Sequence, residues 1–232
     1  MFVHQDVPFV PIGRETIDGV RYYKAMGSED FVKLPSITSV ISWRNRDKFK
    51  EWRRKVGEEE ANNVTRKATH RGTDAHTLIE EYLNNVEKLS LSSVLPLSQY
   101  LFKQAKPDLD KIDNILCQEQ SLWSFELGIA GSVDCIAEHT GENGEPELAI
   151  IDFKTSKQPK PRAWIEDYFV QCAAYACMLY EMKGIMVKKF VIIMTCENGE
   201  VEVYEEYNKR KYISLLYDYV GEFAESKLKE YA

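Results

Sequence analysis

The stretch Leu148-Ala149-Ile150-Ile151-Asp152-Phe153-Lys154-Thr155 decides the expected fold, because an apolar, strand-forming run ends in an acid, one residue and a base. Successive side chains of a strand point to opposite faces, so Asp152 and Lys154 should share a face. With the Phe153 carbonyl nearby, this pair can hold a hard cation such as Mg²⁺ beside a water molecule. Taken alone, Asp-x-Lys is common, and an ion pair at a sheet edge is the better explanation.

The strand expected before it carries a second carboxylate, in Ala130-Gly131-Ser132-Val133-Asp134. Strands joined by a hairpin are neighbours, so Asp134 and Asp152 should lie close enough to bind one metal. Two facing carboxylates repel each other unless a cation neutralises them. Gly131 weakens a strand, and it suggests that another backbone or a ligand approaches closely there. The alternative is that Asp134 faces solvent.

Two helical segments add polar pairs at a spacing of four residues, which places each pair on one helix face. His76 and Glu80 form the first pair, and Gln171 and Tyr175 form the second. A lone histidine in such a place is more often structural than a metal ligand. Small residues between Gln171 and Tyr175 permit close packing on a sheet, which explains the second pair without any chemistry.

Turn residues and the periodicity of apolar residues predict the helices and strands of the rest of the chain. Asp18-Gly19 predicts a hairpin turn, and Ser36 predicts the N-cap of a helix. Residues 36–86 are helical in pattern, with breaks expected at Gly57 and Gly72, and a further helix is expected over 97–112. The pattern then changes to strands at Ile115–Phe125, Ile129–Glu138 and Glu147–Lys154, a helix at Pro161–Met182, strands at Val187–Thr195 and Val201–Tyr204, and a helix from Asn208.

This order predicts an α/β (α+β mixed) fold, with a central mixed β-sheet flanked by helices. We expect a single domain over 1–232, made of a β-hairpin extension (1–35), a helical lobe (36–112) and the core sheet with its helices (113–232). A length of 232 residues suits one such domain.

Composition limits the partners. The net charge of −7 argues against a polyanion, yet seven bases lie between Arg44 and Lys55, and four bases with no acid lie between Lys154 and Arg162. Five scattered cysteines indicate reduced thiols rather than a zinc or iron–sulfur site. The N-terminal residues show no secretion signal, and no apolar run is long enough to span a membrane. We therefore expect an intracellular, cytoplasmic protein, and a monomer is compatible with the sequence, which leaves the oligomeric state open.

Taken in order, four motifs resemble those of the PD-(D/E)XK nuclease superfamily in its RecB-like branch. They are Gly72-Thr73…His76, Gly131…Asp134, Asp152-Phe153-Lys154-Thr155 and Gln171…Tyr175. Upstream, the segments Leu34–Val40, Trp52, Val56–Glu58 and Arg71–Thr73 are similar to the mitochondrial genome maintenance exonuclease group and its viral relatives. The resemblance covers roughly residues 34–180. It implies a restriction-endonuclease-like fold and an exonuclease of single-stranded DNA, in DNA repair, replication or recombination.

The resemblance also implies roles for individual residues. His76, Asp134, Asp152 and the Phe153 carbonyl would bind one or two Mg²⁺ or Mn²⁺ ions, with no iron–sulfur cluster. Lys154 would orient or help deprotonate the attacking water and stabilise charge on the phosphate. Gln171 and Tyr175 would position the helix and the nucleic-acid backbone near the metal. The expected catalytic set is Asp134, Asp152, Lys154 and Gln171. Glu80 and Glu119 are second-tier candidates. The expected nucleic-acid contacts are Ser36, Thr38, Ser39, Arg44, Arg71, Thr73, Thr155 and Tyr175.

Other observations bear on the substrate. Hydroxyls at a helix N-terminus can donate hydrogen bonds to phosphate, as Ser36 would. Trp43, Phe49 and Trp52 alternate with the seven bases, where they would stack on bases or, somewhat more often in such patterns, be buried. The alternatives are a structure-specific endonuclease on the same fold, a non-catalytic nucleic-acid-binding protein, and an enzyme that acts on a different phosphoester.

Overall fold

A five-stranded mixed sheet forms the centre of the computed structural model, which describes residues 1–27 and 29–230. Its strands lie in the order β4-β5-β6-β7-β8, where β6 and β7 are parallel and the other neighbours are antiparallel. The strands are β4 (Ile112–Ser124), β5 (Ile129–Thr140), β6 (Pro146–Ser156), β7 (Lys189–Cys196) and β8 (Val201–Glu206). Every residue of β7 is buried, as expected for a strand covered on both faces.

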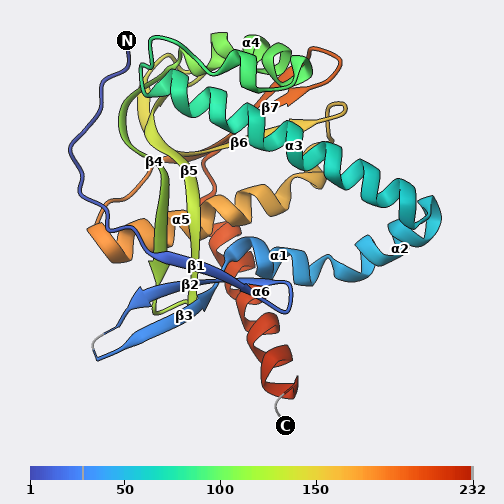
Figure 1. The fold of residues 1–232 in the computed structure, drawn as a ribbon. Coiled ribbons are helices and arrows are strands. Elements are labelled where there is room, and N and C mark those ends of the chain that lie inside the picture. The colour runs from blue at the N-terminus through green and yellow to red at the C-terminus, as the bar shows by residue number, and fades with distance from the viewer. Residues whose placement is uncertain (28, 231–232) are drawn as a thin grey trace.

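Helices cover both faces of this sheet (Figure 1). Helices α3 (Glu58–Leu83) and α4 (Pro96–Leu109) pack on one face, and α5 (Glu166–Lys183) packs on the other. Helix α5 is backed by α6 (Lys209–Glu230) and by α1 (Ile37–Arg44). Alternate residues of the strands enter two separate cores: Ile150 packs in the α5 core, while Ile151 packs in the α3 core. The α/β (α+β mixed) fold expected from the sequence is confirmed.

A second, three-stranded sheet precedes the helices. It consists of β1 (Gly13–Ile17), β2 (Val20–Met26) and β3 (Phe31–Pro35). Asp18 and Gly19 both have positive φ, which confirms the predicted hairpin turn. The third strand was not predicted. It forms because Leu34 pairs with Tyr23, and both side chains are buried with Ala130 of the central sheet.

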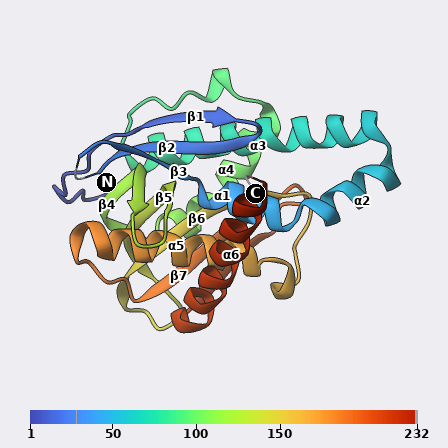
Figure 2. The same cartoon turned by 90° about the horizontal axis from the view of Figure 1, so that it is seen from below.

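The helical segment agrees with the sequence at two of three points. Ser36 caps α1, where its hydroxyl accepts a hydrogen bond from the Ser39 N–H at 3.0 Å. Gly57, at φ 87°, separates α2 (Arg46–Val56) from α3. The predicted break at Gly72 is wrong, because Gly72 lies inside α3. Figure 2 shows α2 and the start of α3 projecting away from the sheets.

Two further findings complete the fold. Of the helices in residues 1–27 and 29–230, none is long and apolar enough to cross a membrane. The five cysteines are free, and four of them are buried.

Candidate functional site

The β5–β6 ladder ends in the middle of the sheet, and this end creates the site. The last paired residues are Cys135 and Ile151, so Asp134 and Asp152 come next, opposite each other, where the strands separate. There the Phe153 N–H donates to the Asp134 carboxylate (N to Oδ2, 2.9 Å) in place of a backbone carbonyl. The separation of the strands leaves room for side chains from neighbouring elements.

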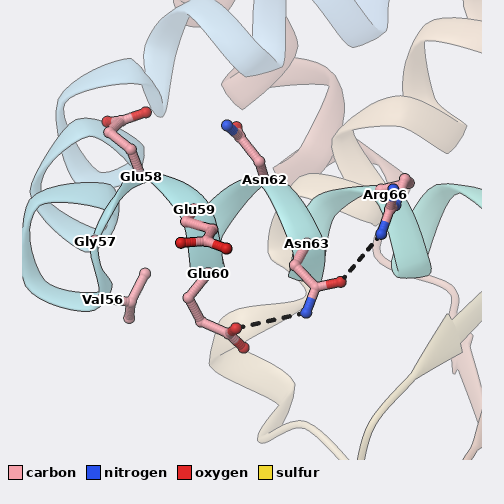
Figure 3. A pocket seen from close by; sticks show the side chains of 8 residues that line it. All are labelled: Val56, Gly57, Glu58, Glu59, Glu60, Asn62, Asn63 and Arg66. Atoms are coloured by element: carbon pink, nitrogen blue, oxygen red, sulfur yellow. Dashed lines mark hydrogen bonds between the residues drawn. The ribbon is translucent and has the colours of Figure 1, made fainter.

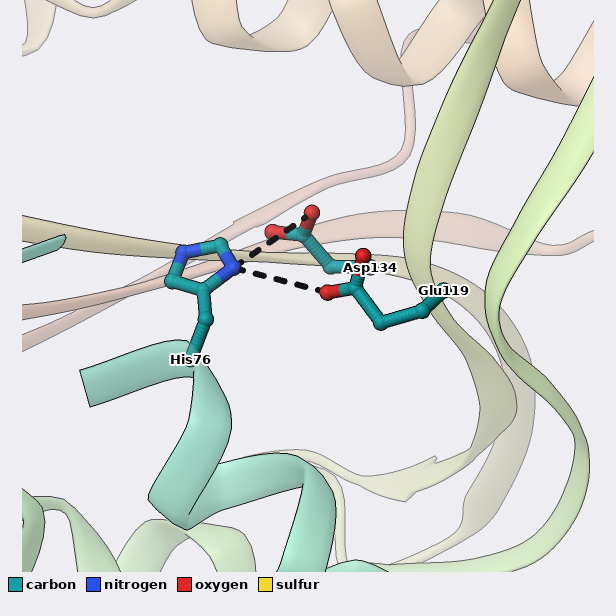
Figure 4. A group of neighbouring side chains, drawn as sticks. All are labelled: His76, Glu119 and Asp134. Atoms are coloured by element: carbon teal, nitrogen blue, oxygen red, sulfur yellow. Dashed lines mark ion pairs between the residues drawn. The ribbon is translucent and has the colours of Figure 1, made fainter. Parts of the chain in front are cut away.

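His76 reaches this opening from α3. Its Nε2 lies 2.9 Å from the Phe153 carbonyl oxygen, so the N–H there donates to that oxygen. Its Nδ1 faces two carboxylates, 3.6 Å from Glu119 Oε1 and 3.8 Å from Asp134 Oδ1 (Figure 4). The backbone of Phe153 therefore holds both His76 and Asp134, one through its carbonyl and the other through its N–H.

Glu119 comes from β4 with an unusual backbone. Its φ is 49°, the left-handed region that non-glycine residues rarely adopt in a strand. Its neighbours Gln118 and Gln120 still pair with Cys135 and Val133, so the irregularity is confined to one residue. Such strain costs on the order of 1–3 kcal/mol and tends to occur at functional sites. Glu119 is only a second-tier candidate in the sequence analysis, because residue type does not reveal a positive φ within a strand.

These three side chains form a candidate metal centre. One ligand atom each of His76, Glu119 and Asp134 lie within 4.8 Å of one another. Carboxylate oxygens suit Mg²⁺ and Mn²⁺, and an imidazole whose other nitrogen donates to a carbonyl is the usual arrangement of a metal-bound histidine. Although burial acts to lower it, the negative charges of Asp134 and Glu119 raise the pKa of His76 to about 9.

Asp152 and Lys154 form an ion pair beside this centre. Asp152 is 1% exposed, and apart from Lys154 its oxygens have no hydrogen-bond donor within the described part of the chain. Burial and the negative charge of Asp134 raise the pKa of Asp152 to about 6. Burial alone would lower the pKa of Lys154, but Asp152 and Asp134 hold it above its usual value. Asp152 is thus a buried carboxylate that lies beside a second carboxylate, an arrangement that a bound cation would stabilise.

Helix α5 supplies Gln171 and Tyr175, which lie against the same strands. The Gln171 side-chain amide donates to the Tyr175 hydroxyl at 3.1 Å, and both residues are buried. A Cβ at Gly131 would lie only 2.8 Å from the Tyr175 ring, so the group that approaches Gly131 closely is a side chain and not the backbone or ligand that was expected.

The predicted nucleic-acid contacts are spread over three places. Arg71, Thr73 and Thr155 lie close to the centre. The Arg71 guanidinium donates to Thr155 Oγ1 at 3.1 Å and pairs with Glu197. Thr73 lines a hollow of about 350 Å³ together with His76 and with Gly72, Thr77, Glu80 and Glu119.

The remaining predicted contacts lie elsewhere. The hydroxyls of Ser36, Thr38 and Ser39 bond one another at the start of α1. Arg44 pairs with Glu222 and lies 4.1 Å from the centre of the Tyr219 ring, so the structure places it against α6.

The aromatic residues that alternate with the seven bases lie in two places, one against α6 and the other on α2. Trp43 packs edge-on against Phe223 of α6. Phe49 and Trp52 contact each other on α2, with ring centres 5.3 Å apart, and Phe49 is 47% exposed.

A hollow of about 830 Å³ at the corner between α2 and α3 contains none of the predicted site residues (Figure 3). Its lining includes three consecutive glutamates, Glu58, Glu59 and Glu60. Exposed acidic groups without a buried partner group give no indication of a ligand there.

Sequence reasoning missed Tyr168. The Lys154 ammonium lies over its ring, 5.1 Å from the ring centre. Tyr168 stands three residues before Gln171, one turn earlier on α5, and this spacing is the signal that marks it.

No family model matches the chain. Mitochondrial genome maintenance exonuclease 1 of Mus musculus is 25% identical over 136 residues, which cover 55% of this chain and 38% of the mouse protein. The Homo sapiens protein of the same name is 24% identical over 136 residues, with the same coverage. The match thus spans less than half the length of these relatives.

A crystal structure of a predicted exonuclease from Eubacterium rectale has a TM-score of 0.40 and 16% identity to this chain, and the match covers 66% of this chain and 63% of that one. The order of its motifs and its similarity to the two mammalian proteins both show that the chain resembles a superfamily of nucleases.

Proposed function

We propose that this protein is a metal-dependent deoxyribonuclease that removes nucleotides from an end of single-stranded DNA, using Mg²⁺ or Mn²⁺. The observation that carries the proposal is the convergence of His76, Glu119 and Asp134 on one point, beside the buried Asp152–Lys154 pair. An opening in a sheet that gathers three carboxylates and two basic side chains suits a cation and a phosphate.

The side chains that would hold the metal are His76, Asp134, Glu119 and Asp152. The Phe153 carbonyl, also expected as a ligand, faces His76 Nε2 and orients the imidazole so that Nδ1 faces the carboxylates. A bound divalent ion would lower the pKa of its water and neutralise charge on the phosphate. Asp152 must be ionised to take part, and at neutral pH it is, since its pKa is about 6.

Lys154 acts as a cation in this proposal. Its pKa is above the usual value, so its ammonium stays protonated at neutral pH and cannot accept the proton of a water molecule. Lys154 therefore stabilises negative charge on the phosphate and orients the attacking water by donating hydrogen bonds. Of the two roles that the resemblance implies, this favours orientation over deprotonation.

The choice of an end rests on the word exonuclease in the name of the two relatives. The choice of single-stranded DNA rests on the resemblance of the motifs and on the aromatic rings near the basic residues of α2. Phe49 is partly exposed beside Arg53, whose guanidinium lies 5.6 Å from the Phe49 ring centre. Exposed aromatic rings beside cations bind single strands without strong sequence preference. A structure-specific endonuclease remains the second candidate, because it would use the same centre.

One gel tests the proposal. End-labelled linear and closed circular single-stranded DNA are incubated with Mg²⁺, Mn²⁺ or EDTA and with the wild type, Asp152→Asn or Asp152→Ala. We expect the wild type to degrade only the linear strand and only with metal. Both variants should lose about a hundredfold or more in rate, in line with the loss of a group that stabilises the transition state.

Glu145→Gln is the matched control, because Glu145 is an exposed acid in the β5–β6 turn. It should cleave like the wild type. Hydrolysis in EDTA, or full activity in a folded Asp152→Asn protein, would contradict the proposed centre. Cleavage of the circle would leave the centre intact and identify an endonuclease.

A further inference from the structure

Tyr168 connects two ammonium groups, and only one of them belongs to the proposed catalytic centre. The first is Lys154, whose Nζ lies over the ring face. The second is Lys160, whose Nζ donates to the Tyr168 hydroxyl at 2.6 Å and lies 5.1 Å from the same ring centre. One side chain of α5 thus fixes the positions of two cations relative to each other.

Lys160 is held in place from a second side. It lies between β6 and α5, and its backbone carbonyl accepts a hydrogen bond from the Tyr204 hydroxyl of β8 at 2.9 Å. The side chain is half-buried, which restricts its motion further.

Lys160 differs from the other basic residues at the centre in its partners. Lys154 pairs with Asp152, and Arg71 pairs with Glu197. Among residues 1–27 and 29–230, no carboxylate lies within ion-pair distance of Lys160. Two ammonium groups at one ring repel each other, and only one of them has a carboxylate to offset the repulsion, so an anion beside Lys160 would be favoured.

We infer that Lys160 is a second phosphate-binding position for the substrate strand, next to the phosphate that is cleaved at Lys154. Tyr168 is a positioning residue, which holds Lys154 by its ring and Lys160 by its hydroxyl. The ligand class is a chain of phosphodiesters, because such a ligand presents phosphates in series to two cations of fixed spacing. The inference rests on the proposed function for the identity of the strand.

A binding experiment without catalysis tests the phosphate contact. A fluorescein-labelled single-stranded oligodeoxythymidine is titrated in EDTA at several salt concentrations with the wild type, Lys160→Met and Lys157→Met. The slope of log K against log salt is negative, and each lost phosphate contact on a single strand lowers its magnitude by about 0.7. We expect this decrease for Lys160→Met alone. Lys157 is the matched control, since it is an exposed lysine in the same loop.

A kinetic experiment tests the role of Tyr168. Tyr168→Phe keeps the ring under Lys154 but removes the hydroxyl that holds Lys160, so KM should rise about tenfold while kcat stays within about twofold. Tyr168→Leu removes the ring as well, so kcat should also fall about tenfold. The double variant Lys160→Met/Tyr168→Phe should be no worse than Lys160→Met, because the two residues act as a unit.

The outcomes separate this inference from the proposed function. Equal salt slopes for Lys160→Met and Lys157→Met would overturn it even if the wild type is an active nuclease. So would a Tyr168→Phe protein with an unchanged KM. If Lys160→Met alone changes the salt slope but the wild type shows no metal-dependent hydrolysis, the phosphate-binding role of Lys160 is supported and the proposed nuclease activity is rejected.

Discussion

At the scale of single residues, the protonation of His76 couples the site to pH. Its imidazole is neutral above pH 6.5 in an unfolded chain, but the neighbouring carboxylates keep it charged up to about pH 9 in the folded protein. The stabilisation from this proton is complete below pH 6.5 and is lost as the pH rises through 9. A metal requires the neutral ring, so proton and metal compete.

We therefore expect Mn²⁺ binding at pH 7.5 to release about one proton, and the affinity to rise about tenfold per pH unit between roughly 6.5 and 9. Below that range, protonation of Asp152 should steepen the loss. Isothermal titration calorimetry in buffers of different ionisation enthalpy measures the released proton. Binding without proton release, or release that persists in His76→Gln, would show that His76 is not the competing group.

Much of the candidate site could be predicted from residue types and their order in the sequence. Asp134, Asp152 and Lys154 could be predicted because they stand on two consecutive strands, in order with the motifs at His76 and Gln171, and the structure brings the three together. Glu119 was ranked too low, since its place depends on a local backbone conformation that only the assembled sheet imposes.

At the scale of elements, Gly131 is the point where α5 meets β5. A methyl group there would lie 2.8 Å from the Tyr175 ring and 3.2 Å from Ile37. Gly131→Ala should therefore lower the free energy of unfolding by about 1–3 kcal/mol, the usual cost of overpacking a core.

Urea unfolding in EDTA measures this change. Gly13→Ala is the control, because nothing lies within 4 Å of a Cβ at Gly13, and it should change stability by less than about 0.5 kcal/mol. Equal stability of Gly131→Ala and the wild type would mean that α5 can move away from β5 at no cost.

The elements of the central sheet were predicted well because their buried strands and turns have strong local patterns. Two features escaped. The strand β3 pairs with β2 and buries Leu34 against Ala130, which is distant in sequence. Gly72 was mistaken for a break, yet the turns on either side continue through it, as helices tolerate a single glycine at a cost of about 1 kcal/mol.

At the scale of the whole molecule, the candidate centre joins helix α3 to two neighbouring strands of the central sheet. His76 belongs to α3, Glu119 to β4 and Asp134 to β5. A ligand that binds only the folded state stabilises it by about 2.7 kcal/mol at a concentration of 100 Kd.

For a chain of this size, that stabilisation should raise the Tm by roughly 5–10 °C on addition of saturating Mn²⁺. A thermal melt with increasing Mn²⁺ measures the rise, and Asp134→Asn should abolish it. Glu145→Gln should show the full rise. An equal rise in Asp134→Asn would mean that the ion stabilises the protein from some other place.

The overall arrangement was the part least accessible from sequence. Charge patterns located the basic run on α2, but its direction away from the sheets depends on how α3 packs. Likewise, Arg44 was expected at the nucleic acid, whereas its pairing with Glu222 depends on the position of the C-terminal helix, 178 residues later.

Phe153 forms its hydrogen bonds to the His76 and Asp134 side chains through its own main-chain atoms. Replacing the Phe153 side chain would leave these two bonds intact, so mutagenesis at position 153 would report only the loss of apolar volume. Only proline, which lacks the N–H, would cut one of them. Substituting the Phe153 side chain therefore does not test these hydrogen bonds. A change to the backbone itself, such as replacing the Phe153 amide with an ester, would test the bond to Asp134.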